Sequence, residues 1–106
     1  MTYTRDYAER EPARAEIDAL TGDILLEFGA PWCGHCIAAQ PAIESVLSIR
    51  DGVHHLKIED GRGNPLGRSF RVKLWPTLVL LRNGVEVART VRPLVVDGVA
   101  HMLATS

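Results

Sequence analysis

The sequence has only two cysteines among its 106 residues, Cys33 and Cys36. Small proteins that depend on disulfides for stability spread several cysteines along the chain, because a cross-link that closes a long loop removes the most entropy from the unfolded state. A bond between Cys33 and Cys36 closes almost no loop. The number and spacing of the cysteines therefore exclude a disulfide-stabilised scaffold and indicate that the pair has a chemical role.

Long apolar runs and a strong net charge are also missing. The strictly apolar runs fall far short of the roughly 18 residues that a membrane-spanning helix requires, and residues 1–6 lack the apolar segment of a signal peptide. The formal net charge of −1 gives no electrostatic reason to expect nucleic acid or an anionic membrane as a partner. We therefore expect a cytoplasmic, monomeric protein, with a periplasmic location as the alternative if a leader has been removed.

The composition is that of an ordinary globular protein, with 46% apolar and 24% charged residues. The length predicts one domain over residues 1–106. Strand-like and helix-like periodicities alternate along the chain, which predicts an α/β fold with a mixed sheet and helices on its faces. The expected helices span 7–20, interrupted at Pro12, 33–50, 66–72 and 95–104, and the expected strands span 24–28, 53–58, 76–81 and 85–91.

Cys33 and Cys36 would lie at the start of the helix expected over 33–50. Helical residues three apart share a face with their side chains about 5–6 Å apart, and a disulfide joins α-carbons about 4.4–6.8 Å apart. The unpaired N–H groups and the positive dipole end of a helix start both stabilise a thiolate, which is the nucleophilic form. Gly34 leaves the approach to the sulfur open, and a protonated His35 would favour the thiolate further.

Two other readings of the cysteines are weaker. A structural zinc site needs four ligands, whereas this chain adds only His54 and His55, which are strand neighbours and point to opposite faces. Two inert core cysteines are the second alternative, and the segment Trp32-Cys33-Gly34-His35-Cys36 at a strand-to-helix junction argues against it. We expect no metal and no cofactor, and assign no role to His54, His55 or His101.

Glu27 is the sole charge in the apolar strand expected over 24–28, six residues before Cys33. Burial disfavours the charged form of a carboxyl group, so a buried Glu27 would be suited to accept the proton of Cys36 when that thiol becomes a nucleophile. The alternative is that Glu27 points outward at the strand end.

Residues 26–36 resemble the active-site segment of protein disulfide isomerase domains in the thioredoxin superfamily, including the Gly-His pair between the cysteines. Pro41, which should kink its helix, matches the proline of the family's active-site helix. Trp75-Pro76-Thr77 matches the family's cis-proline motif, and Asn83-Gly84, a strong hairpin signal, matches its last hairpin. The resemblance runs from about residue 19 to the C-terminus and implies a thioredoxin-like three-layer fold, in which helices flank a central mixed β-sheet.

The resemblance also implies roles for the site residues. Cys33 would attack a substrate disulfide, and the more buried Cys36 would resolve the mixed disulfide. Glu27 would lie beneath Cys36, near Lys57 on the neighbouring strand. The backbone of Trp75 would pair with the substrate. The implied substrate-binding residues are Trp32, Gly34, His35, Trp75, Pro76 and Arg92.

Three positions depart from the family's pattern. Gly29 replaces an aromatic residue, which suggests a more open site on that side, and Ile37 replaces a lysine. Arg92 stands where the family has a glycine that lines the substrate groove, so it would block bulky substrates or select acidic ones. These changes argue against a role as the general thioredoxin of the cell.

The leading hypothesis is a thiol–disulfide oxidoreductase that acts on protein disulfides or dithiols through Cys33 and Cys36, with an enzyme of the thioredoxin reductase type as a candidate electron donor. The alternative is a thioredoxin-fold binding or chaperone module that recruits a specific partner, with incidental redox activity.

We predict that the Cys33–Cys36 couple is more oxidising than that of an ordinary thioredoxin, because His35 favours the reduced form. The reference values are about −270 mV for thioredoxin and about −180 mV for disulfide isomerase. Equilibration of the protein against glutathione buffers measures the potential. A value at or below that of thioredoxin would contradict the prediction.

Overall fold

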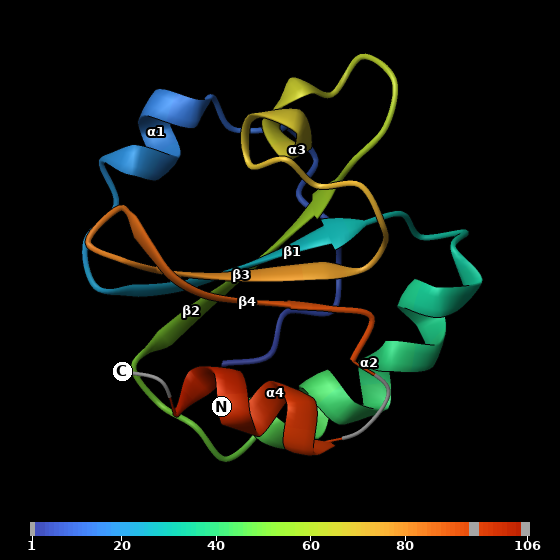
Figure 1. The fold of residues 1–106 in the computed structure, drawn as a ribbon, viewed down its shortest axis with the longest axis vertical. Coiled ribbons are helices and arrows are strands. Elements are labelled where there is room, and N and C mark those ends of the chain that lie inside the picture. The colour runs from blue at the N-terminus through green and yellow to red at the C-terminus, as the bar shows by residue number, and fades with distance from the viewer. Residues whose placement is uncertain (1, 94–95, 105–106) are drawn as a thin grey trace.

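The structure is a computed structural model that describes residues 2–93 and 96–104. Its centre is a four-stranded sheet (Figure 1). The strand order is β2-β1-β3-β4, with β1 and β2 parallel and the other pairs antiparallel. This confirms the predicted mixed sheet. The strands are β1 (Asp23–Gly29), β2 (Val53–Glu59), β3 (Thr77–Arg82) and β4 (Val85–Val91), and the helices are α1 (Arg14–Asp18), α2 (Gly34–Leu47), α3 (Pro65–Ser69) and α4 (Val96–Leu103).

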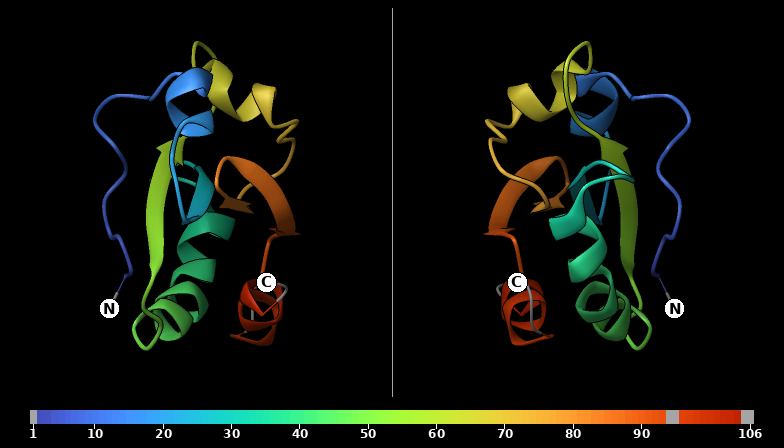
Figure 2. Two further views of the ribbon diagram at one scale, coloured as in Figure 1. Left: turned by 90° about the vertical axis from the view of Figure 1, so that its left-hand side faces the viewer. Right: turned by 90° about the vertical axis from the view of Figure 1, so that its right-hand side faces the viewer.

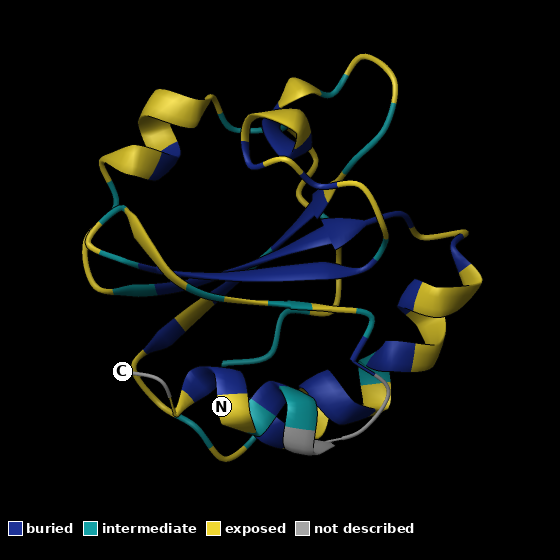
Figure 3. Cartoon of the chain, viewed as in Figure 1, coloured by how far each residue is buried: buried dark blue, intermediate teal, exposed yellow. Residues whose placement is uncertain are grey.

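Helices cover both faces of the sheet, so the elements form three layers. The short helices α1 and α3 lie on one face, and the longer helices α2 and α4 lie on the other (Figures 1 and 2). The two central strands, β1 and β3, are buried almost throughout (Figure 3). Burial on both faces explains why their sequences are nearly continuous apolar runs rather than alternating ones.

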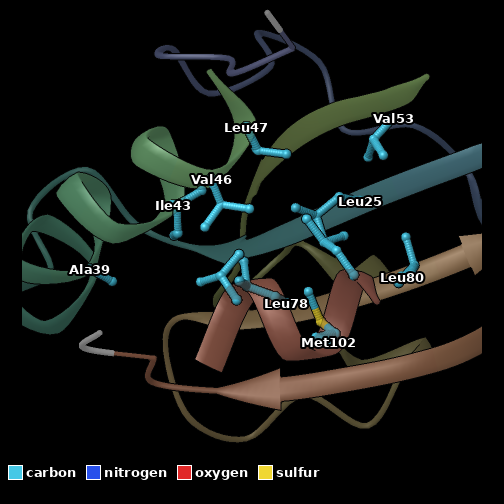
Figure 4. Packing of buried hydrophobic residues seen from close by; sticks show 11 residues of the cluster. Leu25, Ala39, Ile43, Val46, Leu47, Val53, Leu78, Leu80 and Met102 are labelled. Carbon is cyan, nitrogen blue, oxygen red and sulfur yellow. The ribbon is translucent and has the colours of Figure 1, made fainter. Parts of the chain in front are cut away.

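Alternate residues of β1 belong to different hydrophobic clusters. Leu25 packs with α2 and α4 in the cluster of Figure 4, whereas Leu26 and Phe28 pack with the α1 and α3 side. Because side chains alternate along a strand, Glu27 points to the same face as Leu25, toward α2. The sheet thus directs the one charged residue in the middle of β1 at the helix that carries the cysteines.

The prediction of a helix over residues 7–20 is wrong before Arg14. Residues 2–13 form an extended segment that runs beside β2 (Figure 2). The N–H of Thr2 donates to the Leu47 carbonyl at 3.1 Å, and the N–H of Ala8 donates to the Lys57 carbonyl at 2.8 Å. Pro12 has no N–H to donate and holds the preceding residue extended, and the segment directs backbone donors to the end of α2 and to β2.

The other boundaries differ by a few residues. α2 ends at Leu47 rather than near residue 50, and α3 spans Pro65–Ser69 rather than 66–72. Residue 95, the expected start of the last helix, lies outside the described residues. Pro41 lies inside α2, and Asn83 and Gly84 join β3 to β4 with φ angles of 51° and 82°, which confirms the predicted hairpin. Among the helices described here, none has the length and apolar character needed to cross a membrane.

Candidate active site

The two cysteines lie at the start of α2, as predicted, with one correction. The helix begins at Gly34, and Cys33 is its N-cap residue. The Sγ atom of Cys33 accepts a hydrogen bond from the N–H of Cys36 at 3.2 Å. The first N–H groups of a helix have no partner within the helix, so the sulfur of Cys33 takes the place that an N-cap oxygen usually fills.

The environments of the two thiols differ. Both are free, and Cys33 is 8% exposed whereas Cys36 is 1% exposed, which confirms the expectation that Cys36 is the more buried. Burial, followed by the hydrogen bond with Cys33, raises the pKa of Cys36 to about 12. At neutral pH Cys36 is therefore a thiol, and it needs a proton acceptor before it can act as a nucleophile.

Trp75 packs against the cysteines from the loop before β3, and Pro76 follows it in the chain. The peptide bond between them is cis. Trp75 contacts the small buried cluster of Ala30, Cys33 and Cys36. Its indole Nε1 donates to Asp60 Oδ2 at 2.8 Å, which fixes the ring beside the sulfur atoms.

Trp32 forms an exposed wall of the site. Its side chain is 72% exposed, and its ring meets that of Trp75 edge-on with centroids 5.5 Å apart. Gly34 and His35 are also exposed. Three of the predicted substrate-binding residues therefore present surface directly beside Cys33.

Arg92 lies across the backbone of the same loop. Its N–H donates to the Pro76 carbonyl at 2.8 Å, and its side-chain Nε donates to the Trp75 carbonyl at 2.9 Å. The φ angle of Arg92 is 52°, a conformation that glycine adopts without strain. The side chain of Arg92 is thus hydrogen-bonded to the carbonyl of Trp75. The family resemblance implies that the backbone of Trp75 pairs with the substrate, so this carbonyl already has a partner.

Glu27 is completely buried, so the alternative of an outward-pointing side chain is wrong. Its Oε2 accepts a hydrogen bond from Gln40 Nε2 at 2.7 Å, and its Oε1 lies 2.9 Å from His55 Nε2. Gln40 Nε2 also donates to the carbonyl of Cys36 at 2.9 Å. The carboxylate is therefore tied to the backbone of the resolving cysteine through one amide group.

Lys57 pairs with Glu27 in the register of β1 and β2 and is buried, as the resemblance implies. Its Nζ donates to Gln40 Oε1 at 3.1 Å and to the Arg5 carbonyl at 2.8 Å. Among residues 2–93 and 96–104, its hydrogen bonds do not include the carboxylate of Glu27. The side chain of Lys57 is therefore connected to Glu27 indirectly, by hydrogen bonds through the amide group of Gln40.

Sequence reasoning missed Gln40 and His55. Both positions carried a usable signal, because His55 precedes Lys57 by two residues in a strand and shares its face, and Gln40 follows Cys36 by four residues in a helix. The assignment of His55 as an ordinary strand residue is wrong, since it is 1% exposed and contacts Glu27.

The side of the site near Gly29 is closed, contrary to the expectation of a more open site. A Cβ atom on Gly29 would lie 2.5 Å from Cys36 Sγ and 3.2 Å from the hydroxyl oxygen of Tyr7. Tyr7 comes from the extended N-terminal segment, and its hydroxyl group lies on the same side of Gly29 as Cys36 Sγ. Burial, followed by the negative charges of Cys36 and Glu27, raises the pKa of Tyr7 above its usual range. The N-terminal segment therefore fills the space that an aromatic side chain at position 29 would need.

A surface cleft of about 360 Å³ reaches this region from solvent. Its lining includes Arg5, Tyr7, Cys36, Ile37, Gln40 and Lys57. Ile37 is 59% exposed, so the position that has a lysine in the family's pattern presents an apolar surface here. In the part of the chain that the structure describes, there is no group of three or more His, Cys, Asp or Glu side chains placed to hold a metal ion.

Comparison with known proteins agrees with this geometry. The profile of the thioredoxin family matches residues 8–104, and the chain belongs to that family. The structure is similar to that of thioredoxin 2 from Pseudomonas aeruginosa PAO1 in its reduced form, with a TM-score of 0.87, 51% identity, and coverage of 97% of this chain and 95% of that chain.

Curated relatives carry two kinds of name. A thioredoxin from Echinococcus granulosus is 31% identical over 75 residues, which are 69% of this chain and 70% of the relative. A protein disulfide-isomerase from Datisca glomerata is 36% identical over 87 residues, which are 76% of this chain and 17% of the relative. The chain spans only 33% and 49% of the length of two further curated relatives.

We predict that Gly29→Ala destabilises the protein by about 1–3 kcal/mol, the usual cost of overpacking a core, because the new methyl group would displace Cys36. Urea unfolding measures the change. Gly34→Ala is the matched control, since a Cβ at that position meets nothing within 4 Å. Equal stabilities of the two variants would show that the space beside Cys36 is not tight.

Proposed function

We propose that the protein is a thiol–disulfide oxidoreductase in which Cys33 attacks and Cys36 resolves. The observation that supports this most directly is the arrangement at the start of α2, where the more exposed sulfur of Cys33 accepts the N–H of Cys36 and the second thiol lies buried behind it. A thiolate at this position is stabilised by the N–H groups and by the positive end of the dipole at the helix start.

The reaction has two steps. The Cys33 thiolate attacks one sulfur of a substrate disulfide, which forms a mixed disulfide and releases the other substrate sulfur as a thiolate. Cys36 then loses its proton and attacks Cys33 Sγ, which releases the second substrate thiolate and leaves a Cys33–Cys36 disulfide. Two electrons pass to the substrate in each cycle.

Glu27 is the proposed proton acceptor for Cys36. The pKa of about 12 of Cys36 makes an acceptor necessary at neutral pH, and the charge of Glu27 acts on this thiol. The link from Glu27 through Gln40 to the Cys36 carbonyl holds the carboxylate beside the first turn of α2. Lys57, separated from Glu27 by Gln40, is proposed to support this arrangement.

The proposed substrates are protein disulfides, because large apolar side chains are exposed on and near the helix start that carries Cys33. Exposed Trp32, Ile37 and Leu74 offer contacts to an extended polypeptide. Reduction of the resulting disulfide by an enzyme of the thioredoxin reductase type would complete the cycle.

A binding or chaperone module is the alternative function. Such a module has no chemical need for a helix-capping cysteine, a buried second thiol and a buried carboxylate in one site, so these features favour the enzyme.

We predict that the wild-type protein accelerates the reduction of insulin by dithiothreitol and that Cys33→Ser does not. Cys36→Ser is the matched variant, and it should accumulate a mixed disulfide through Cys33 because the resolving step is lost. Turbidity follows insulin reduction, and mass spectrometry detects the adduct. Equal turbidity from the wild type and Cys33→Ser would favour the binding module.

Arg92 is proposed to select acidic substrates, since its guanidinium group lies over the backbone beside the cysteines. We predict that Arg92→Gly reduces kcat/KM for a disulfide peptide with acidic residues next to the cysteine by about fivefold relative to a neutral peptide. This corresponds to about 1 kcal/mol for one exposed charge pair. Arg92→Lys is the control that keeps the charge, and an unchanged ratio in Arg92→Gly would refute the selection.

A further inference from the structure

His55 forms a hydrogen-bonded bridge from the N-terminal segment to Glu27. Its ring is buried, its Nδ1 accepts the backbone N–H of Thr4 at 2.8 Å, and its Nε2 lies 2.9 Å from Glu27 Oε1. A backbone N–H can only donate, so Nδ1 carries no proton in this arrangement. The ring proton must then be on Nε2 and point at the carboxylate.

The hydrogen-bond network therefore assigns a neutral ring to His55. A second proton, on Nδ1, would face the Thr4 N–H and place two donors against each other. While the bond to Thr4 is in place, Nδ1 of His55 serves as the acceptor and Nε2 as the donor to Glu27.

The second partner of Glu27 is also a neutral donor with a fixed orientation. Gln40 Oε1 accepts from the Tyr3 hydroxyl at 2.7 Å and from Lys57 Nζ at 3.1 Å. Two donors on this atom identify it as the amide oxygen, so the amide NH₂ group must face Glu27. The nearest cation in this network, Lys57, is held one amide away from the carboxylate.

Two neutral donors orient a carboxylate without placing a full positive charge on it. A cation in direct contact stabilises the charged form of a carboxylate and opposes its protonation. An acceptor for the Cys36 proton needs both a fixed position and the capacity to take that proton. The contacts of Glu27 fix its position through two donors and place Lys57 on Gln40 instead of on the carboxylate.

We propose that His55, locked by the Thr4 N–H as a neutral Nε2–H donor, is a positioning residue that holds Glu27 ready to take the Cys36 proton. This rests on the proposed function. The Cys36 proton passes to the Glu27 carboxylate, the thiolate attacks Cys33 Sγ, and the bond from Cys33 to the substrate sulfur breaks. Glu27 later returns the proton to solvent.

The test separates the two steps with stoichiometric 5,5′-dithiobis(2-nitrobenzoate). Attack by Cys33 releases a first equivalent of nitrothiobenzoate, and resolution by Cys36 releases a second. We expect His55→Leu to slow the second phase about tenfold, as for the loss of a hydrogen bond to a charged group, and to leave the first phase unchanged.

Three variants control for a merely structural effect. His54→Leu alters the exposed neighbour on the other face of β2 and should change neither phase. His55→Gln keeps a neutral N–H donor and should restore the second phase to within about threefold of the wild type. His55→Leu should have no further effect in a Glu27→Gln background, because both changes remove the same function.

The outcomes distinguish the failure of each proposal. Absence of a second equivalent from the wild type would refute the proposed function, and an unchanged second phase in Glu27→Gln would refute its proton-acceptor step. A slow second phase in Glu27→Gln with a normal one in His55→Leu would overturn only the role of His55. In wild-type protein at pH 7, ¹⁵N NMR should show His55 protonated at Nε2 alone, and a doubly protonated ring or an Nδ1–H tautomer would also overturn it.

Discussion

The carboxylate of Glu27, buried in the central strand β1, is the group that the surrounding structure must satisfy. An unpaired charge at this depth would cost several kcal/mol. Gln40 from α2 and His55 from β2 each donate to one oxygen, and Thr4 from the N-terminal segment fixes His55 in turn. Within residues 2–93 and 96–104, no buried side-chain nitrogen or oxygen lacks a hydrogen-bond partner. The buried charge of Glu27 thus connects α2, β2 and the N-terminal segment behind the cysteines.

The surroundings of Cys33 and Cys36 differ, because Cys33 lies near the protein surface and Cys36 is buried. On the side of Cys33 lie the exposed ring of Trp32 and the partly buried side chain of Arg92. On the side of Cys36 lie the buried, hydrogen-bonded side chains of Glu27, Gln40 and His55. Their proposed role is limited to the transfer of the Cys36 proton. Only two residues separate the cysteines, and the start of α2 leaves Cys33 8% exposed while Cys36, in the first turn, is 1% exposed.

The sequence predicted the parts of the fold and site that depend on local pattern. Apolar runs predicted the central strands, and the spacing of Cys33 and Cys36 placed them at a helix start. The N-terminal helix was wrong because Pro12 and hydrogen bonds to β2 outweigh a weak helical pattern. The role of Tyr7 was missed because it depends on its proximity to Cys36, a residue distant in sequence, and periodicity carries no information about such a contact. Strand periodicity did place His55 on the same face as Lys57, but it did not show that the Glu27 carboxylate lies against that face.

The extended N-terminal segment gives the start of the chain an influence on chemistry at its centre. Tyr3, Thr4 and Tyr7 contact Gln40, His55 and Cys36 in turn, yet they lie outside the sheet and its two layers of helices. Cleavage after Tyr7, or a fusion that pulls this segment away, would leave the three layers intact. It would nevertheless admit water to the carboxylate and free the imidazole to choose either tautomer. An engineered variant of this protein could therefore keep its three layers and still transfer protons poorly, which makes residues 2–7 a segment through which the reaction can be tuned.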